Sequence, residues 1–446
     1  MTSPMALPVS THQPDSAGPT IPPSQEPPAD GAQTVAQTVL AGHSRAIVKA
    51  LLLGGPHSRG DLATRLDLSA GSLTRLSKPL IAAGIIIEQP LQDSAPGLGR
   101  PSVPLAFNHR AYRFIGIKLT QTHAYGALTL ADASLEHQLD LPLADQSPQA
   151  ALAAITQIAG ALSDAAPADS QVAAIGISLG GHVSNYRTVT HADHLGWDQV
   201  PLASLVEDAT GIPCVVENDI VAQTEFTHWF GQGADTDSFA LFTMGAGIGY
   251  GLVTHGHTVG SPEAGYSLLS HFPLMSTRLF SYANRLIAAC GGAGSMDVPT
   301  GSDSHLAPWP LLTTCGHIGC ATAMLTLRGL EQRATHAFGR TVSFQQLLGL
   351  ATAGDPTAQL LTDASGYALG TALAAISNLT LVPKIVLGGE ACELANVARS
   401  ALLSGLHDHR DKRTQDPQLF FQAPDLALWA QGAAVVAVHN TILGRV

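Results

Sequence analysis

The sequence predicts a mixed α/β protein in which a small helical module with a β-hairpin precedes a larger α/β domain of two lobes. Residues 45–83 contain three short segments with the apolar spacing of helices, followed by an apolar strand pattern and turn residues. Beyond residue 112, strand-like and helix-like segments alternate. Two blocks, 114–225 and 238–398, each open with a hairpin pattern, so we expect related lobes with a cleft between them.

The composition of the 446-residue chain is typical of a well-buried soluble protein, with 45% hydrophobic and 13% charged residues. No apolar run reaches the roughly 18 residues needed to span a bilayer, and the N-terminus lacks the pattern of a secretory signal. The five cysteines are mostly scattered and do not resemble a disulfide framework. We therefore expect a reduced, cytoplasmic protein with no membrane partner.

Charge is distributed unevenly along the chain. The net charge is −12, yet residues 41–105 hold seven basic and four acidic residues, a local net charge of +3. Residues 1–40 contain eight prolines and three acidic residues, a composition that predicts a disordered tail. The basic segment is thus the part of the chain where a polyanion could bind.

The basic segment, taken as residues 41–110, has the signals of a winged helix-turn-helix. A first helix over 45–53 ends at two glycines, and Ser58 can cap a second helix over 59–67. Ser69 can cap a third helix that runs to about residue 83, and the strand IIIEQ with the turn-rich stretch after it completes a wing. The pattern therefore predicts a DNA-binding module that reads double-stranded DNA.

The candidate DNA contacts are small or basic residues on the exposed face of the third helix and at the wing tip. They are Ser69, Ser72, Thr74, Arg75, Lys78 and Arg100. The alternative is a three-helix protein-interaction module whose basic residues form a solvated face.

Several motifs of the larger domain occur in a familiar order: ISLGGHV (177–183), GIPCVVENDIVAQTEF (211–226), CGHIGCATAMLTLRGLE (315–331) and KIVLGGE (384–390). Together with the N-terminal module, they resemble the ROK family (repressors, open reading frames and sugar kinases), which includes xylose and N-acetylglucosamine repressors. The resemblance covers about residues 43–444. It implies an actin-like, sugar kinase-type ATPase fold over 111–446, with an insertion at about 275–311.

The resemblance also implies a ligand site. The triplet Glu217-Asn218-Asp219 matches a motif whose aspartate is the general base of ROK kinases, and His271 matches a sugar-contacting histidine. We therefore expect Asn218, Asp219 and His271 to bind an effector. The alternative for the Asn-Asp pair is a cap for the helix that starts near Ile220, and the two roles could coexist.

Catalysis is not expected, because residues that the family's kinases need are replaced. Lys118 stands where the kinases place a metal-linked aspartate, and an ammonium group cannot help to hold Mg²⁺. We therefore expect no ATP and no enzyme activity. Leu268 and Thr322 occupy positions where the family has sugar-binding glutamates, which implies weaker hydroxyl recognition or a different ligand.

The family's zinc motif is incomplete in this chain. Two cysteines, Cys315 and Cys320, remain, and Thr313 replaces the first ligand. His271 could supply a third zinc ligand, with His317 or water as the fourth. Structural zinc and two buried thiols without a metal both stay open.

The function that follows is a transcriptional regulator, most consistent with a repressor of carbohydrate transport and metabolism genes, which binds operator DNA and a sugar or sugar-derivative effector. A palindromic operator would favour a homodimer or tetramer. Two alternatives stay open: a ROK sugar kinase that phosphorylates a hexose or amino sugar with ATP, and a regulator controlled by a protein partner.

Overall fold

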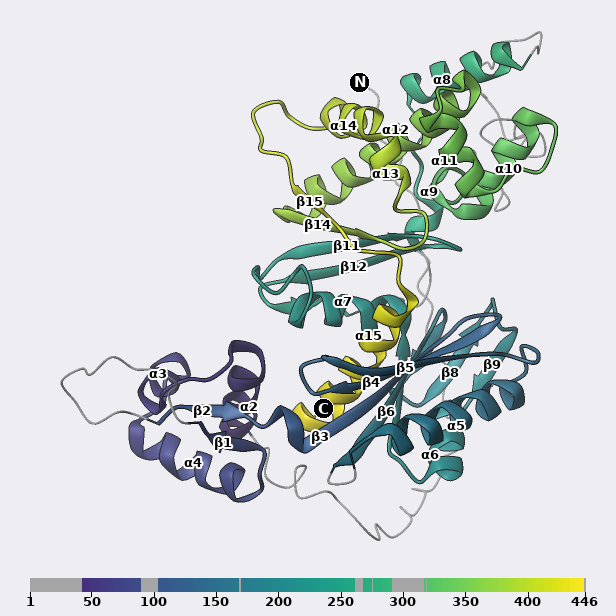
Figure 1. Cartoon of the computed structure of the whole chain (residues 1–446). Coiled ribbons are helices and arrows are strands. Elements are labelled where there is room, and N and C mark those ends of the chain that lie inside the picture. The colour runs from purple at the N-terminus through teal and green to yellow at the C-terminus, as the bar shows by residue number, and fades with distance from the viewer. Residues whose placement is uncertain are drawn as a thin grey trace, which may run out of the picture.

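The structure is a computed structural model, and it describes residues 42–89, 103–167, 170–260, 268–274, 276–290, 317 and 319–444. Three bodies follow one another in Figure 1: a small N-terminal module, a first lobe and a second lobe. The mixed α/β architecture and the order of its parts agree with the prediction. The proposed tail over 1–40 lies outside the described residues.

Three helices and a two-stranded hairpin form the N-terminal module. They are α2 (His43–Gly54), α3 (Arg59–Arg65), α4 (Ala70–Ala82), β1 (Ile86–Glu88) and β2 (Leu105–Phe107). Ser58 Oγ accepts a hydrogen bond from the Asp61 amide and Ser69 Oγ accepts one from the Ser72 amide, each at 3.1 Å. Both helices after the first therefore begin at the caps that the sequence predicts.

The first lobe is built on a five-stranded sheet in the order β10-β6-β3-β4-β5. Its strands are β3 (Tyr112–Leu119), β4 (His123–Leu130), β5 (Leu135–Pro142), β6 (Gln171–Leu179) and β10 (Cys214–Asn218). A three-stranded sheet accompanies it, made of β7 (His182–Ser184), β8 (Thr188–Ala192) and β9 (Trp197–Val200). Helices α5 (Pro148–Ala165) and α6 (Leu202–Thr210) pack on the large sheet and bury one of its faces.

The second lobe repeats this plan with the sheet order β13-β12-β11-β14-β15. Its strands are β11 (Phe239–Met244), β12 (Ile248–Thr254), β13 (His257–Thr258), β14 (Lys384–Gly388) and β15 (Gln418–Phe421). Its helices are α8 (Thr277–Ala289), α9 (Ala321–Leu325), α10 (Leu327–Phe338), α11 (Phe344–Thr352), α12 (Pro356–Thr380), α13 (Leu394–Val397) and α14 (Arg399–Asp408). Helix α8 falls at the start of the predicted insertion, and residues 291–316 lie outside the described residues.

The two sheets have the same strand directions. In each one, an antiparallel hairpin (β3–β4 or β11–β12) has a further antiparallel strand on one side. Two parallel strands lie on its other side. The two hairpin patterns in the sequence therefore mark two lobes of related topology, as predicted.

The end of the chain returns to the first lobe. Helix α15 (Leu426–Val438) and the π-helical turn η4 (His439–Leu443), yellow in Figure 1, pack on β3, β6 and on α7 (Asp219–Trp229). A Cβ at Gly116 would lie 1.9 Å from the Ala430 carbonyl oxygen, and one at Gly176 would lie 1.9 Å from that of Ala433. Because only glycine permits such an approach, these two residues seat α15 directly on the sheet.

Residues Leu426–Leu443 form the one stretch of described helix that is long and apolar enough to cross a membrane. Of that stretch, 61% is buried inside the protein. Its contacts with the sheet and α7 are those of a core helix, so its apolar character is explained by packing.

Candidate functional site

The outer face of α4 carries most of the predicted DNA contacts. Thr74, Arg75 and Lys78 are exposed, and within the described part of the chain neither basic side chain has a carboxylate partner. Ser69 and Ser72 lie in the first turn, where Ser69 caps the helix. The face can therefore present small hydroxyls and two cations to a DNA groove.

Three other basic residues of the module have contacts away from this face. Arg59 forms an ion pair with Glu88 of the wing, and Arg65 Nη1 lies 3.0 Å from Nε2 of His57. Lys49 lies with its Nζ 5.9 Å from the centre of the Trp229 ring, so it faces the first lobe. The positive charge that the sequence assigns to the module is thus only partly on the α4 face.

The wing consists of β1 and β2, which pair from Ile86↔Phe107 to Glu88↔Leu105. Arg100 at the predicted wing tip lies outside the described residues. Its proposed contact with the minor groove stays a prediction.

In the first lobe, Asn218 ends β10 and caps α7. Its Oδ1 accepts hydrogen bonds from the amides of Ile220 at 2.9 Å and Val221 at 3.2 Å, and its Nδ2 donates to the Gly181 carbonyl at 2.9 Å. The helix-cap interpretation therefore describes the Asn218 side chain in this structure. Asn218 and Asp219 are adjacent, as the sequence requires, but His271 belongs to η2 (Leu268–His271) of the second lobe.

The Asp219 carboxylate is ion-paired with the ammonium group of Lys118. Their side chains are 16% and 8% exposed, so the pair is largely shielded from water. The Lys118 ammonium also lies 5.3 Å from the centre of the Trp429 ring, a cation–π arrangement. Residues from β3, α7 and α15 thus meet at one point.

Tyr125 lies beside Lys118, because the two residues are direct partners across β3 and β4. Burial, together with the negative charges of Asp140 and Glu390, raises the pKa of Tyr125. Glu390 comes from the second lobe. We call Lys118, Tyr125, Asp219, Glu390 and Trp429 the cleft cluster.

Sequence reasoning found two members of the cleft cluster and missed the other three. Tyr125 stands in the same hairpin as Lys118. Pairing the two strands around the turn at 120–122 places Tyr125 opposite Lys118, so the hairpin pattern could have indicated it. Glu390 ends the motif KIVLGGE and could also have been noticed. Trp429 has no local signal, because only the return of α15 to the first lobe brings it under Lys118.

The glycine-rich hairpin β11–β12 is explained by close packing. A Cβ at Gly245 would lie 2.0 Å from Glu390 Oε2, and one at Gly251 would lie 1.8 Å from Oγ1 of Thr224 in α7. These glycines therefore make room for Glu390 and for α7, whether or not the hairpin also contacts phosphate.

The predicted zinc ligands are only partly described. Backbone hydrogen bonds join the His271 and Cys320 segments: Leu274 donates to Gly319, and Ala321 donates to Phe272, each at 3.1 Å. The ring centres of His271 and His317 are 5.1 Å apart. Cys315 lies outside the described residues, and within them no group of three or more His, Cys, Asp or Glu residues could hold a metal ion.

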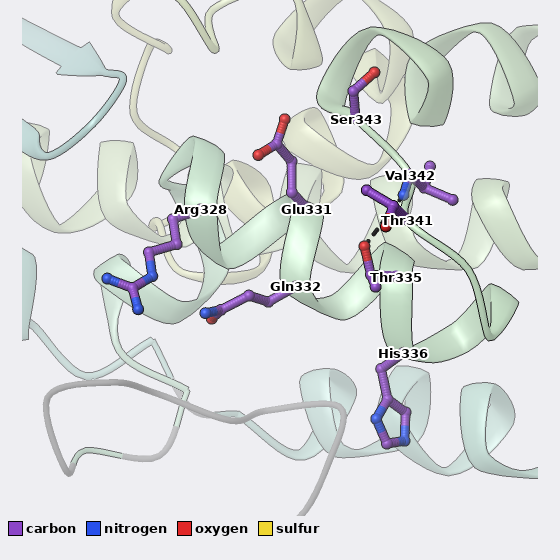
Figure 2. Close-up of a pocket in the computed structure, with 8 residues that line it drawn as sticks. All are labelled: Arg328, Glu331, Gln332, Thr335, His336, Thr341, Val342 and Ser343. Carbon is purple, nitrogen blue, oxygen red and sulfur yellow. Dashed lines mark hydrogen bonds between the residues drawn. The ribbon is translucent and has the colours of Figure 1, made fainter.

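One hollow lies on the second lobe, far in the chain from most of the cleft cluster. It has a volume of about 470 Å³ between α10 and the loop that leads to α11 (Figure 2). Two of its polar groups hold the loop in place: Thr335 Oγ1 accepts from the Val342 amide at 3.2 Å, and Glu331 Oε1 accepts from the Phe344 amide at 2.9 Å. Nothing in its lining indicates a ligand.

A second hollow, of about 380 Å³, adjoins the cleft cluster. Tyr125 and Asp140 line it from β4 and β5, and Asp425 lines it from the start of α15. It lies next to Lys118 across the β3–β4 hairpin. This hollow therefore offers a ligand-sized space beside the hairpin that carries Lys118, the ion-pair partner of Asp219.

Comparison with known proteins places the chain among regulators and sugar kinases. A curated transcriptional regulator of Mycobacterium tuberculosis is 26% identical over 355 residues, covering 77% of this chain and 74% of the relative. The DNA-binding transcriptional repressor Mlc of Escherichia coli is 23% identical over 347 residues, covering 77% and 79%.

Two solved structures share the fold. A ROK family transcriptional regulator described as a homologue of Escherichia coli Mlc has a TM-score of 0.72 and 22% identity, and the match covers 92% of this chain and 98% of the other. A ROK hexokinase from Thermus thermophilus has a TM-score of 0.55 and 23% identity, covering 72% and 97%. The regulator likeness extends over more of this chain than the kinase likeness. Since the ROK family pattern also matches residues 114–423, the chain belongs to the ROK family.

Proposed function

We propose that this chain is a cytoplasmic DNA-binding transcriptional regulator, a repressor of carbohydrate transport and metabolism genes. The observation that carries the proposal is the exposed α4 face, where Arg75 and Lys78 stand beside a wing. A single helix with unpaired cations and small residues suits a major groove. The regulators of Mycobacterium tuberculosis and Escherichia coli named above support the same function.

The DNA-binding part of the proposal can be tested without a known operator. The full chain is used to select duplexes from a random pool, and affinity for the selected duplex is then measured for the parent and for a chain that lacks residues 41–110. We expect the truncated chain to stay soluble and to lose binding. Equal affinity of the two chains would contradict the assignment.

The cleft cluster supports a non-catalytic domain. A general base must be available to a substrate hydroxyl, whereas the Asp219 carboxylate is held by the Lys118 ammonium. We propose that Lys118 replaces the metal-linked aspartate of the family's kinases and that Mg-ATP is not used. ATP-dependent phosphorylation of a panel of hexoses and amino sugars is expected to be absent, and clear turnover would favour a kinase.

We propose that the effector is a sugar or sugar derivative bound beside Asp219 and the adjoining hollow, with His271 as a contact from the second lobe. A sugar hydroxyl can donate to a carboxylate and accept from an ammonium group, so Lys118 and Asp219 together suit a polyol. The test is release of the selected duplex by a panel of sugars, for the parent and for Asp219→Asn. A response at the same sugar concentration in both proteins would place the ligand elsewhere.

Zinc and assembly are further parts of the proposal. Structural zinc would be held by His271, Cys315 and Cys320, because imidazole and thiolate are its preferred ligands. We expect zinc in the purified parent and its loss in a Cys315→Ser/Cys320→Ser variant, with Cys214→Ser as the control for a buried thiol in the first lobe. A homodimer or tetramer is expected from light scattering, since two-fold operators need paired modules.

A further inference from the structure

Helices α7 and α15 lie side by side, and both run from the cleft cluster to the DNA-binding module (Figure 1). Helix α7 begins at Asp219, and α15 carries Trp429 in its first turn. At the other end, Trp229 of α7 and Ile442 of η4 belong to one apolar core with Ile47 of α2. Each helix therefore joins a residue of the cleft cluster to the core of the module.

The contact between α7 and α15 is close and contains an unsatisfied amide. A Cβ at Gly432 of α15 would lie 3.1 Å from Oε1 of Gln223 and 3.2 Å from the Ala222 carbonyl oxygen of α7. Gln223 is 1% exposed, and neither of its side-chain polar atoms has a hydrogen-bond partner within the described ranges. A buried polar group without a partner costs stability, so the amide of Gln223 contributes no hydrogen bond that would fix one helix against the other.

A buried polar junction lies where the two helices meet α2. Glu225 of α7 is 1% exposed, and its Oε2 accepts a hydrogen bond from Nδ1 of His439 at 3.2 Å. The ring centres of His439 and Trp229 are 4.7 Å apart, with the planes tilted by 35°. The Lys49 ammonium of α2 also lies over the Trp229 ring, 5.9 Å from its centre. A Cβ at Gly444 would lie 3.0 Å from Nη2 of Arg45, which places α2 against the chain end as well.

This junction is more directional than an apolar contact would be. A buried carboxylate must keep its hydrogen bond, and the closely packed Trp229 and His439 rings accept only certain orientations. A movement of α7 or α15 is therefore transmitted to Lys49 and Arg45 instead of being absorbed by repacking. The π-helical turn η4 begins at His439, the residue that bonds Glu225. Such turns interrupt the regular hydrogen bonds of an α-helix and occur often at functional sites, which fits a role of His439 in transmission.

We propose that α7 and α15 transmit the state of the cleft cluster to α2, and that Glu225 and His439 are positioning residues that hold α2 on the ends of these helices. Neither residue belongs to the cleft cluster or to α4. The transmission itself needs no effector, and only its use in regulation rests on the proposed function.

The experiment changes a residue of the cleft cluster and measures the effect on α2 in the full chain. Lys118→Met breaks the ion pair of the cleft cluster, and hydrogen–deuterium exchange is followed in peptides that cover α2. We expect exchange in α2 to rise at least about threefold. Lys384→Met is the matched control, because Lys384 is also a buried lysine with an aspartate partner (Asp235) and an aromatic ring (Phe420) but lies in the second lobe. It should leave α2 unchanged.

The second step tests the junction. The variant His439→Phe keeps a ring but removes the hydrogen bond to Glu225. When Lys118→Met is added to His439→Phe, the rise of exchange in α2 should be less than about half of the rise that Lys118→Met causes in the parent chain. Asp219→Asn replaces Lys118→Met if the latter does not fold. An unchanged α2 in Lys118→Met, or an equal rise in Lys384→Met, would overturn the proposal. Binding of the selected duplex is measured separately, so loss of the DNA-binding function and loss of transmission are told apart.

Discussion

The two lobes share a sheet topology, but their buried lysines have different partners. In the first lobe, Lys118 meets Asp219, whose side chain is 16% exposed, and the pair faces the cleft cluster. In the second lobe, Lys384 meets Asp235, whose side chain is 76% exposed, and it also donates to the Gln232 carbonyl at 2.9 Å. Only the Lys118–Asp219 pair removes both charges from water. Removing one partner of that pair therefore leaves a buried charge without a counter-charge, which is not so for Lys384 and Asp235.

The lobes also differ in where their closely packed helices come from. In the first lobe the covering helix is α15, which comes from the end of the chain and sits on Gly116 and Gly176. In the second lobe, one of the tight glycine contacts joins two helices of that lobe: a Cβ at Gly370 of α12 would lie 2.0 Å from the Leu402 carbonyl oxygen of α14. The comparison shows that related topologies serve different ends, because the end of the chain ties the first lobe to the DNA-binding module through η4 and α2, whereas the α12–α14 contact lies within the second lobe.

The largest expected effect concerns the seat of α15. Gly116→Ala places a methyl group where the Ala430 carbonyl lies at 1.9 Å, so backbone must move and the free energy of unfolding should fall by about 3 kcal/mol or more. The control is Gly349→Ala in α11, where no atom lies within 4 Å and a helix gains up to about 1 kcal/mol. Urea unfolding measures both. A Gly116→Ala protein as stable as the parent would show that α15 is not fixed on the sheet.

The second prediction compares the two lysines. Lys118→Met leaves Asp219 buried without its counter-charge, and we expect a loss of about 2 kcal/mol in the free energy of unfolding. Lys384→Met should cost less, because Asp235 is already solvated. Adding Asp219→Asn to Lys118→Met should restore part of the loss. If the lysine variants lose equal stability in thermal unfolding, the contrast between the lobes is wrong.

The third prediction is a pH dependence at the junction with the module. Burial, with repulsion by Lys49 and Arg45, lowers the pKa of His439 to about 4, and burial lowers the pKa of His228 to about 4. An unfolded histidine has a pKa of about 6.5, so between these values the unfolded chain binds protons that the folded chain does not. The free energy of unfolding is therefore not reduced by these histidines above pH 6.5. It falls as the pH is lowered from 6.5 towards 4, because protonation then favours the unfolded chain.

We expect His439 alone to account for a fall of about 2 kcal/mol in the free energy of unfolding between pH 7 and 4.5. The measurement is urea unfolding across this range for the parent and for His439→Gln. The variant removes one titrating group, so its profile should be flatter by that amount. Parallel profiles would mean that His439 does not titrate with unfolding.

The smallest expected effect distinguishes the basic residues of the exposed α4 face from Lys49, which faces the first lobe. Arg75→Ala should weaken binding to a selected duplex by about 1 kcal/mol, and Lys78→Ala should reduce the slope of log affinity against log salt by about one. Lys49→Ala should leave that slope unchanged, because Lys49 faces Trp229. A change of slope in Lys49→Ala would place α2 on the DNA.

Local chemistry explains what could be predicted. The caps at Ser58 and Ser69, the hairpin over 114–130 and the repeated α/β plan follow from side chains that act on their own neighbourhood. The cap at Asn218 is of the same kind, since its Oδ1 bonds amides two and three residues ahead. Such signals survive in the sequence because the interacting residues are close along the chain.

What only the tertiary structure decided are the contacts between distant segments. Lys118 and Asp219 are 101 residues apart, and no spacing rule indicates that they pair. Trp429 and His439 stand on a helix whose apolar residues predict burial without saying on which lobe. The sequence by itself therefore determined the elements, the two-lobed plan and the family. Which side chains face each other depended on how α7 and α15 pack on the first lobe, because periodicity encodes that a face is buried and not which surface buries it.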